Sequence, residues 1–275
     1  MSLDQLHPFA GQHAIESAAF ALDFIGELDI AEVLALRNAA NQLVGDFPVV
    51  AEKQVATLNF QVGAGSASAS SPSIEVGGFT MQRPALLLTE RPLRLIDISR
   101  SGVVVVINDY TRWDKFKADV DRYLTVLLAP IDNQKAVAGI GLQFNDIFLW
   151  RADPSDLKLN EVFSANNPYI APNVLEAPLL WHSHHGYLVS DSEPVQNQQL
   201  DNINVSRVVV NEEHRLQILT SHRVTFEKPL ESWSTNKTLF FNIQEKLHNK
   251  NKAILRALLT PDAQLKINLN GPKEM

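Results

Sequence analysis

The feature that most constrains the fold is a run of β-branched residues that leads directly into the pattern of a long amphipathic helix. Residues 103–107 are almost all valine and show no polar face, which is typical of a strand covered on both sides. Thr111 is placed to cap the helix that follows, with Asp114 three residues on, and Pro130 marks the helix end. The apolar stripe of this helix consists of Trp113, Phe116, Val120, Leu124 and Leu127. The sequence therefore predicts a sheet that is covered by a helix at 111–129.

The same order of elements is predicted twice along the chain. The first half is predicted to contain strands at 15–24, 54–62, 78–82, 93–99 and 103–109, with helices that start at Asp29 and Thr111. The second half is predicted to contain strands at 137–150, 179–189, 200–211 and 215–226, a short helix or turn at 155–163, and a long helix at 238–259. We therefore expect an α+β fold built as a tandem duplication of a β-α-β(3–4)-α unit. The two units are expected at 1–132 and 133–275, each an antiparallel sheet covered by a long helix.

This order of elements is similar to the TATA-binding-protein-like repeat, an analogy of fold that carries no DNA-binding function. The formal net charge of −7 over 275 residues argues against nucleic-acid and anionic-membrane partners. The absence of cysteine excludes disulfides, thiolate metal sites and cysteine nucleophiles. Residues 1–9 lack the apolar segment of a signal peptide, and no window approaches the roughly 20 apolar residues of a membrane span. A cytoplasmic location is therefore expected.

A cluster of histidines in the second half is the first candidate site. His182 and His184 are two residues apart on a predicted strand and so share a face, and imidazole pairs of this kind bind zinc or another borderline metal. A third ligand would come from His222 on a neighbouring strand, or from Asp191 or Glu193 downstream. The alternative, which we prefer, is a polar strand face whose histidines hydrogen-bond to neighbours. No cofactor is expected other than such a divalent metal.

Asp146 is the second candidate, because it occupies an apolar position of the predicted strand at 137–150. A carboxylate there must be paired, hydrogen-bonded, protonated or placed at a bulge. Arg112, at the start of the predicted helix, is the candidate partner. In one interpretation the two form a buried ion pair that sets the strand register, and Asp146→Ala would destabilise the protein by roughly 3–5 kcal/mol. In the other they are the polar pair of a small-ligand pocket between the sheet and the long helix.

The sequence lacks the motifs of the common catalytic classes, namely Gly-x-Ser-x-Gly, Gly-x-Gly-x-x-Gly and His-Glu-x-x-His. His248, on the final helix, is expected on the solvent-facing side. We therefore expect a non-enzymatic binding or interaction module whose partner is a protein or a second copy of the chain. The alternatives are a metal-dependent hydrolase that uses His182 and His184, and a small-ligand-binding protein with a pocket at Asp146 and Arg112.

Several short stretches together resemble a family of uncharacterised, sporadically distributed bacterial proteins over nearly the whole chain. They are His7-Pro8-Phe9, Phe47-Pro48, Gly78-Phe79-Thr80, residues 110–116, residues 141–148, residues 200–204, Leu247-His248 and Leu259-Thr260. The resemblance implies a bacterial, cytoplasmic protein of an accessory system such as a defence or toxin–antitoxin locus, and it carries no activity, cofactor or catalytic residue. Asp146 matches the family pattern, although Asn145 and Ile147 stand where an aromatic and a basic residue are expected.

Overall fold

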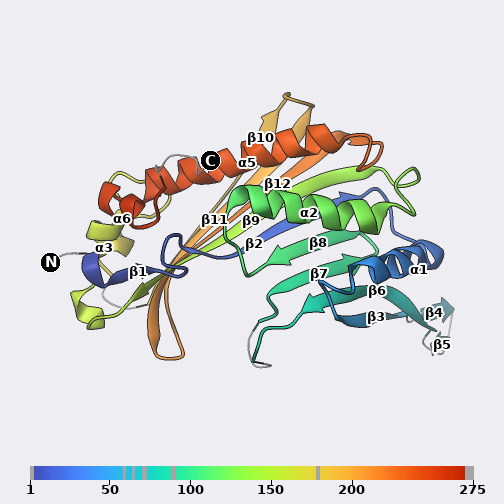
Figure 1. Cartoon of the computed structure of the whole chain (residues 1–275), viewed down its shortest axis with the longest axis horizontal. Helices are drawn as coiled ribbons and strands as arrows, with labels where there is room; N and C mark the ends of the chain where they lie inside the picture. The colour runs from blue at the N-terminus through green and yellow to red at the C-terminus, as the bar shows by residue number, and fades with distance from the viewer. Residues whose placement is uncertain are drawn as a thin grey trace.

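The chain has a mixed α+β architecture built on one ten-stranded antiparallel sheet (Figure 1). The computed structural model describes residues 3–57, 60–63, 66–69, 73–87, 91–177 and 180–269. The strands are β1 (Leu6–Pro8), β2 (Ile15–Phe24), β3 (Val49–Thr57), β4 (Phe60–Gly63), β5 (Ser66–Ala69), β6 (Ser73–Arg83), β7 (Arg94–Ser99), β8 (Gly102–Ile107), β9 (Val137–Trp150), β10 (Trp181–Asp191), β11 (Asn197–Val210) and β12 (Glu213–Leu230). The helices are α1 (Ile30–Ala39), α2 (Trp113–Leu128), α3 (Leu159–Val162), α4 (Pro172–Leu175), α5 (Lys237–Leu258) and α6 (Pro261–Lys266), with 3-10 turns at Leu3–Gln5, Ala40–Leu43 and Pro154–Asp156.

Both halves of the chain contribute to the same sheet. Its strand order is β10-β11-β12-β9-β2-β8-β7-β6-β3, with β1 paired to β9 beyond the end of β2, while β4 and β5 form a separate two-stranded sheet. The halves join where β2 pairs with β9 at the centre. From each of these two central strands the chain passes to an outer edge, β3 or β10, and returns strand by strand towards the centre. A long helix, α2 or α5, then follows.

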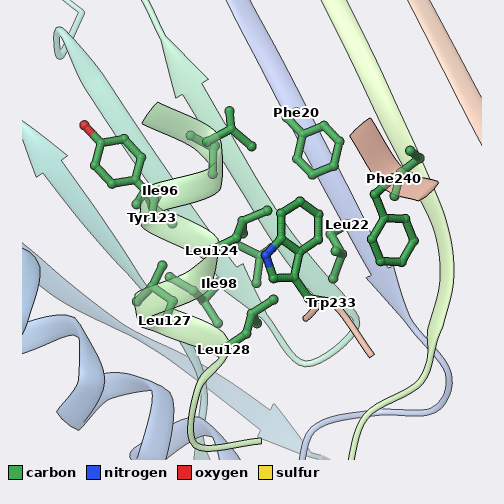
Figure 2. Close-up of a cluster of buried hydrophobic side chains, with 14 of the residues drawn as sticks. Phe20, Leu22, Ile96, Ile98, Tyr123, Leu124, Leu127, Leu128, Trp233 and Phe240 are labelled. Carbon is green, nitrogen blue, oxygen red and sulfur yellow. The ribbon is translucent and has the colours of Figure 1, made fainter. Parts of the chain in front are cut away.

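The long helices α2 and α5 cover one face of the sheet. Every second residue of a strand points towards these helices. Phe20 and Leu22 of β2 are examples, and both are fully buried against the helix layer (Figure 2). Leu124 of α2 and Phe240 of α5 belong to the same apolar cluster, in which Trp233 stacks on Phe240 at 5.3 Å between ring centroids. The apolar stripes that the sequence shows on the two helices are therefore the surfaces that cover the sheet.

The start of α2 differs from the expectation. Thr111 does not cap the helix; Arg112 is the N-cap residue, in an extended conformation, and no side chain caps the first turn. In the preceding connection the Asp109 carboxylate is held by the Arg94 guanidinium, and Arg112 still has extended dihedral angles, so the first helical residue is Trp113. By contrast, α1 begins as its pattern predicts, with a capping box between Asp29 and Glu32.

Other boundaries shift by a few residues. Of the strand expected at 54–62, residues 54–57 belong to β3, which already begins at Val49, residues 60–62 belong to β4, and residues 58–59 lie outside the described residues. Between the predicted strands at 54–62 and 78–82, where no element is predicted, residues 66–69 form β5, and residues 64–65 and 70–72 lie outside the described residues. Helix α5 ends before Thr260-Pro261 as expected, and the short α6 follows, capped by the Thr260 side chain. Among the residues that the structure describes, no helix has the length and apolarity needed to cross a membrane.

Candidate functional site: a pocket at a buried polar seam

A line of buried polar residues separates two apolar clusters beneath α5. On β9, Phe144 belongs to one cluster and Phe148 to the other, and Asp146 lies between them. We call the whole line the polar seam; it consists of Asp146, Gln199, Asp201, Thr220, His222, Gln244 and Asn251. Buried polar groups are costly unless they find partners, so a continuous set of them needs a reason.

One end of the polar seam opens into a pocket of about 250 Å³, which we call the seam pocket. Five parts of the chain build it: the connection into β2, the start of α2 with the residues just before it, the strand β9, the C-terminal half of α5 and the residues after α6. Its polar and aromatic lining includes His13, Tyr110, Arg112, Trp113, Asp146 and His248. The remaining wall contains aliphatic side chains such as Ile15 and Leu255. An apolar hollow with a few convergent polar groups is the usual form of a small-molecule site.

The Asp146 carboxylate is buried in the wall of this pocket without a counterion. The side chain is 1% exposed, and its Oδ2 has no hydrogen-bond partner among the described residues. Its neighbours in register on the adjacent strands are Ile15 and Ile218. Burial raises the pKa of Asp146 from its ordinary 3.8 to about 7, because the charged form is poorly solvated there. The carboxyl is therefore close to half ionised at neutral pH.

Aromatic rings pack around the pocket. The His248 imidazole stacks on the Trp113 indole with centroids 4.1 Å apart and planes 10° apart, and His13 meets Tyr110 edge to face at 5.4 Å. Burial lowers the pKa of His248 to about 4 and also lowers the pKa of His13, so both imidazoles are neutral at pH 7. Their Nδ1 atoms have no hydrogen-bond partner among the described residues. The pocket thus presents unused hydrogen-bonding atoms beside a lone carboxylate.

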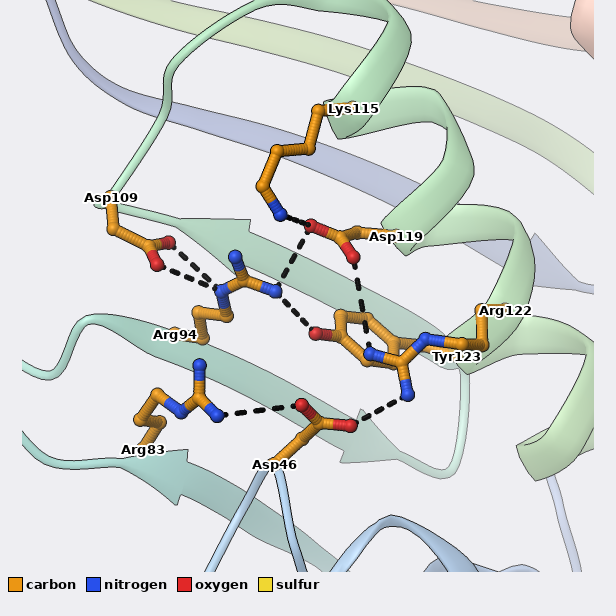
Figure 3. Close-up of polar contacts among 8 residues, drawn as sticks. All are labelled: Asp46, Arg83, Arg94, Asp109, Lys115, Asp119, Arg122 and Tyr123. Carbon is orange, nitrogen blue, oxygen red and sulfur yellow. Dashed lines mark hydrogen bonds and ion pairs between the residues drawn. The ribbon is translucent and has the colours of Figure 1, made fainter.

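A network around Arg94 fixes the segment that carries Tyr110 and Arg112 (Figure 3). Arg94 is 5% exposed, and its Nε lies 2.9 Å from the Asp109 carboxylate, directly before Tyr110. Its Nη1 lies 3.0 Å from Asp119 and donates to the Tyr123 hydroxyl at 2.6 Å, both on α2. The guanidinium therefore ties the strand β7, the connection and the helix together, which positions one side of the pocket.

A second tie joins the two long helices. The Trp113 Nε1 donates to the Glu245 carboxylate at 2.7 Å, and the Lys117 ammonium lies 3.0 Å from the same carboxylate. These contacts and the stacking on His248 hold the start of α2 against the middle of α5. The walls of the pocket are thus fixed before a ligand binds, as expected of a largely pre-formed site.

The other end of the polar seam is a closed ion-pair cluster. The Asp201 carboxylate lies 2.6 Å from His222 Nδ1, accepts a bond from Gln199 Nε2 at 2.7 Å and pairs with the Lys250 ammonium on α5. Asp201 and His222 are fully buried. Bonds from these groups lower the pKa of Asp201 although burial acts in the opposite direction. Between the two ends, Thr220 donates to the Asn251 side chain at 2.6 Å.

The predicted histidine site is not assembled. His182 and His184 share an exposed face of the edge strand β10, and His184 Nδ1 bonds to the Asn204 side chain. His222 lies on the other face of the sheet, because Asn204 is in register with Leu219 and a side chain three residues on points the opposite way. Asp191 pairs with Lys246 of α5. Within the described ranges, no group of three or more histidine, aspartate or glutamate side chains is placed to hold a metal ion.

Zinc addition tests this arrangement. Two imidazoles on an exposed strand would leave half of a tetrahedral zinc shell to water. We therefore expect micromolar zinc to leave the melting temperature of the protein unchanged, because a ligand stabilises the native state only when it binds there. A rise in melting temperature that disappears in the double variant His182→Ala/His184→Ala would instead establish a metal site on β10.

The Asp146 and Arg112 pair is brought into one pocket, but not into an ion pair. Both residues line the seam pocket, and no hydrogen bond or ion pair joins them in the part of the chain that the structure describes. His13, Tyr110 and His248 are further site residues that the sequence did not indicate, and the expectation that His248 faces solvent is wrong. A signal did exist: His248 lies four residues after Gln244 and three before Asn251, so it borders the buried stripe of α5.

Two larger depressions are less suited to a specific ligand. They measure about 530 and 460 Å³ and lie around the short helices α3, α4 and α6. The acidic side chains that line them, such as Glu161, Glu176 and Asp262, are at least partly exposed. The buried charge in the first depression, Arg207, is 3% exposed and already donates to the Pro154 carbonyl oxygen at 2.6 Å, so it does not depend on a ligand for a partner.

Comparison with known proteins gives no relative: a scan against protein-family models finds no match, and a search of curated proteins finds none either. The similarity to the bacterial family noted above therefore stays a prediction. The class of the protein is defined by its own fold and site. It is an α+β protein with a single large antiparallel sheet and a pocket of ligand size between that sheet and its covering helices.

Proposed function

We propose that this protein is a non-enzymatic binding module that takes a small ligand in the seam pocket. The observation that carries the proposal is the Asp146 carboxylate, which is 1% exposed, has an unpartnered oxygen among the described residues and lines a hollow of about 250 Å³. A buried charge without a protein partner is destabilising, and a ligand that supplies the partner would remove that cost. In a structural ion pair the partner of a buried charge comes from the protein, whereas in a binding site it comes from the ligand.

The surroundings of Asp146 support binding more than catalysis. The Trp113 and His248 rings stack on each other, so each covers one face of the other ring. The Trp113 Nε1 already donates a hydrogen bond to Glu245. Tyr110 has its pKa raised by burial and by the nearby Asp146 charge, so its hydroxyl stays protonated. Among the described residues that line the pocket there is no serine, threonine or cysteine. The site thus offers recognition groups without a hydroxyl or thiol nucleophile of these types.

We further propose that the two halves arose by duplication, in the TATA-binding-protein-like order. The support is topological: β2 and β9 lie side by side at the centre, and each is followed by an excursion to the far edge, a return towards the centre and a long helix. The halves differ in their helix-covered cores. The half covered by α2 is largely apolar, whereas α5 covers the polar seam. In this view a ligand site developed in one of two equivalent positions.

The resemblance of the sequence to sporadically distributed bacterial proteins supports a place in an accessory bacterial system. A module with a pocket of this size would then act as a sensor, in which a bound metabolite alters contact with a protein partner. A second copy of the chain is the other candidate partner, because the edge strand β10 exposes Leu188 and Val189 and could pair with another strand. The ligand site is the part of this proposal that can be tested on the isolated protein.

The test is capture of a small molecule. The purified protein is equilibrated with a bacterial small-molecule extract, washed and denatured, and the released compounds are compared by untargeted mass spectrometry. We expect at least one compound to be enriched on the natural protein and depleted at least about tenfold on Asp146→Leu, which removes the carboxylate and narrows the pocket.

A matched control separates the pocket from general charge effects. Asp191→Asn removes a carboxylate that pairs with Lys246 outside the pocket, so it should retain the captured compound. Circular dichroism and denaturant melts establish that all three proteins are folded. A set of released compounds that is the same for the natural protein and Asp146→Leu would refute the ligand site.

A further inference from the structure

We infer that the ligand of the seam pocket is a small zwitterion, with a protonated nitrogen that meets Asp146 inside and a carboxylate or phosphate that meets Arg112 at the mouth. The inference rests on the proposed function and assigns the chemical class of the ligand. It follows from the different charges that the pocket presents at its buried and exposed ends.

The buried end selects a cation or a strong hydrogen-bond donor. Asp146 is flanked in register by Ile15 and Ile218, and its Oδ2 has no donor among the described residues. The imidazoles of His13 and His248 in the same pocket have lowered pKa values and carry no positive charge at pH 7. An ammonium or an N–H group of a ligand would supply the missing charge-assisted bond. A carboxylate in that position would instead meet a like charge.

The exposed end selects an anion. Arg112 is exposed, and in the described part of the chain its guanidinium takes part in no hydrogen bond or ion pair. It is also the N-cap residue of the 16-residue helix α2, whose first turn has no side-chain cap. The positive end of the helix dipole and the free peptide N–H groups favour an anion there. The acidic residue of that turn, Asp114, is paired with Lys117 at 3.3 Å and so is partly neutralised.

The size of the pocket limits the ligand. A volume of about 250 Å³ equals the share of about eight water molecules in the liquid. This is just below the usual range of sites for drug-sized ligands, which begins at roughly 300 Å³. The pocket therefore fits a metabolite about as large as an amino acid. Aliphatic wall residues such as Leu255 would contact the apolar part that joins the two charged ends.

Two series of probes with matched skeletons test the charge pattern. The first is γ-aminobutyrate, butylamine and butyrate, and the second is phenylalanine, phenethylamine and 3-phenylpropionate; O-phosphoethanolamine represents the phosphate form. Each is titrated at pH 8, where Asp146 is ionised, and binding is followed by the melting temperature and by calorimetry. In at least one series we expect the zwitterion to bind more tightly than the amine, and the amine more tightly than the acid. Comparison of γ-aminobutyrate with O-phosphoethanolamine distinguishes a carboxylate ligand from a phosphate ligand.

Two variants assign the ends of the probe. Asp146→Asn should weaken the zwitterion and the amine by at least about tenfold and leave the acid unchanged, whereas Arg112→Gln should weaken the zwitterion and the acid several-fold and leave the amine unchanged. Arg91→Gln is the matched control, because Arg91 is an exposed arginine that pairs with Glu16 outside the pocket.

The outcomes separate this inference from the proposed function. If acids bind best, if Asp146→Asn leaves amine binding unchanged, or if no probe binds at millimolar concentration, the zwitterion assignment is wrong. The capture experiment still decides whether the pocket takes a ligand of another class. If capture also finds no compound that depends on Asp146, both proposals fail together.

Discussion

Asp146→Asn should make the protein more stable by roughly 4 kcal/mol at pH 8, and should change its stability little at pH 4. The substitution keeps the shape of the side chain and removes a charge that has no counterion among the described residues. The direction is opposite to the expectation from the sequence, in which an ion pair with Arg112 made Asp146 stabilising. Denaturant unfolding at several pH values measures the effect.

The sign follows from proton linkage. The pKa of Asp146 is raised in the folded state, from 3.8 to about 7, so between these two values the folded protein binds more protons than the unfolded chain. The free energy of unfolding therefore falls as the pH rises through this window and stays reduced above it. Asparagine does not titrate, so the stability difference between the two proteins should open between pH 4 and pH 7. A difference that does not change with pH would show that the carboxyl has a partner in the folded state.

His248→Phe provides the opposite control. Phenylalanine can retain the stacking on Trp113, which has a centroid distance of 4.1 Å in the natural protein. Burial lowers the pKa of His248 to about 4, so the natural protein loses stability as the pH falls from 6.5 towards 4, by up to roughly 3 kcal/mol. As the pH falls through this range, the stability lost through His248 is offset by the stability gained through Asp146. The free energy of unfolding of the natural protein should therefore depend only weakly on pH. In Asp146→Asn the free energy of unfolding should follow the titration of His248, and in His248→Phe it should follow the titration of Asp146.

Asp201→Ala is expected to destabilise the protein by roughly 3–5 kcal/mol, because it leaves buried partners without their acceptor. His222 and Gln199 both bond to the Asp201 carboxylate, and Lys250 of α5 pairs with it. Truncation would thus damage the contact between the sheet and α5 beside the seam pocket. The measurement is the midpoint of urea unfolding with an unchanged slope.

The surface pair Asp191–Lys246 is the matched control for this prediction. It too joins the β10 side of the sheet to α5, but both side chains are partly exposed. Asp191→Ala should therefore cost less than about 1 kcal/mol, as is usual for exposed ion pairs. Similar losses for Asp191→Ala and Asp201→Ala would show that burial does not decide the strength of these contacts. The double variant Asp201→Leu/His222→Leu should recover only part of the loss, because the two leucines need no partner but Gln199 and Lys250 still lack their acceptor.

The local patterns of the sequence were sufficient to identify most elements. The alternation in β9 predicts the observed strand Val137–Trp150, and the stripes of α2 and α5 predict helices that differ from the observed ones by one or two residues at each end. The same alternation places Asp146 on the covered face, where the structure has it 1% exposed. These features depend on residues two, three or four positions apart, and backbone geometry alone relates such neighbours.

The candidate site was only partly predictable for the same reason. The sequence marked Asp146 and Arg112, but it placed His248 in solvent and did not mark His13 or Tyr110. The histidine cluster, the most conspicuous motif, lies divided between the two faces of the sheet. Whether such residues meet depends on which strands pair and how the helices lie across them.

By itself, the sequence determined the class of fold, most of the elements and the alternation of faces along the strands it identified, because periodicity sets these locally. Only the tertiary structure decided that β2 pairs with β9 within one sheet, and that Tyr110, Asp146 and His248 line one pocket. These three residues lie far apart in the chain, so their meeting depends on long-range packing of the two apolar clusters, which no local period encodes.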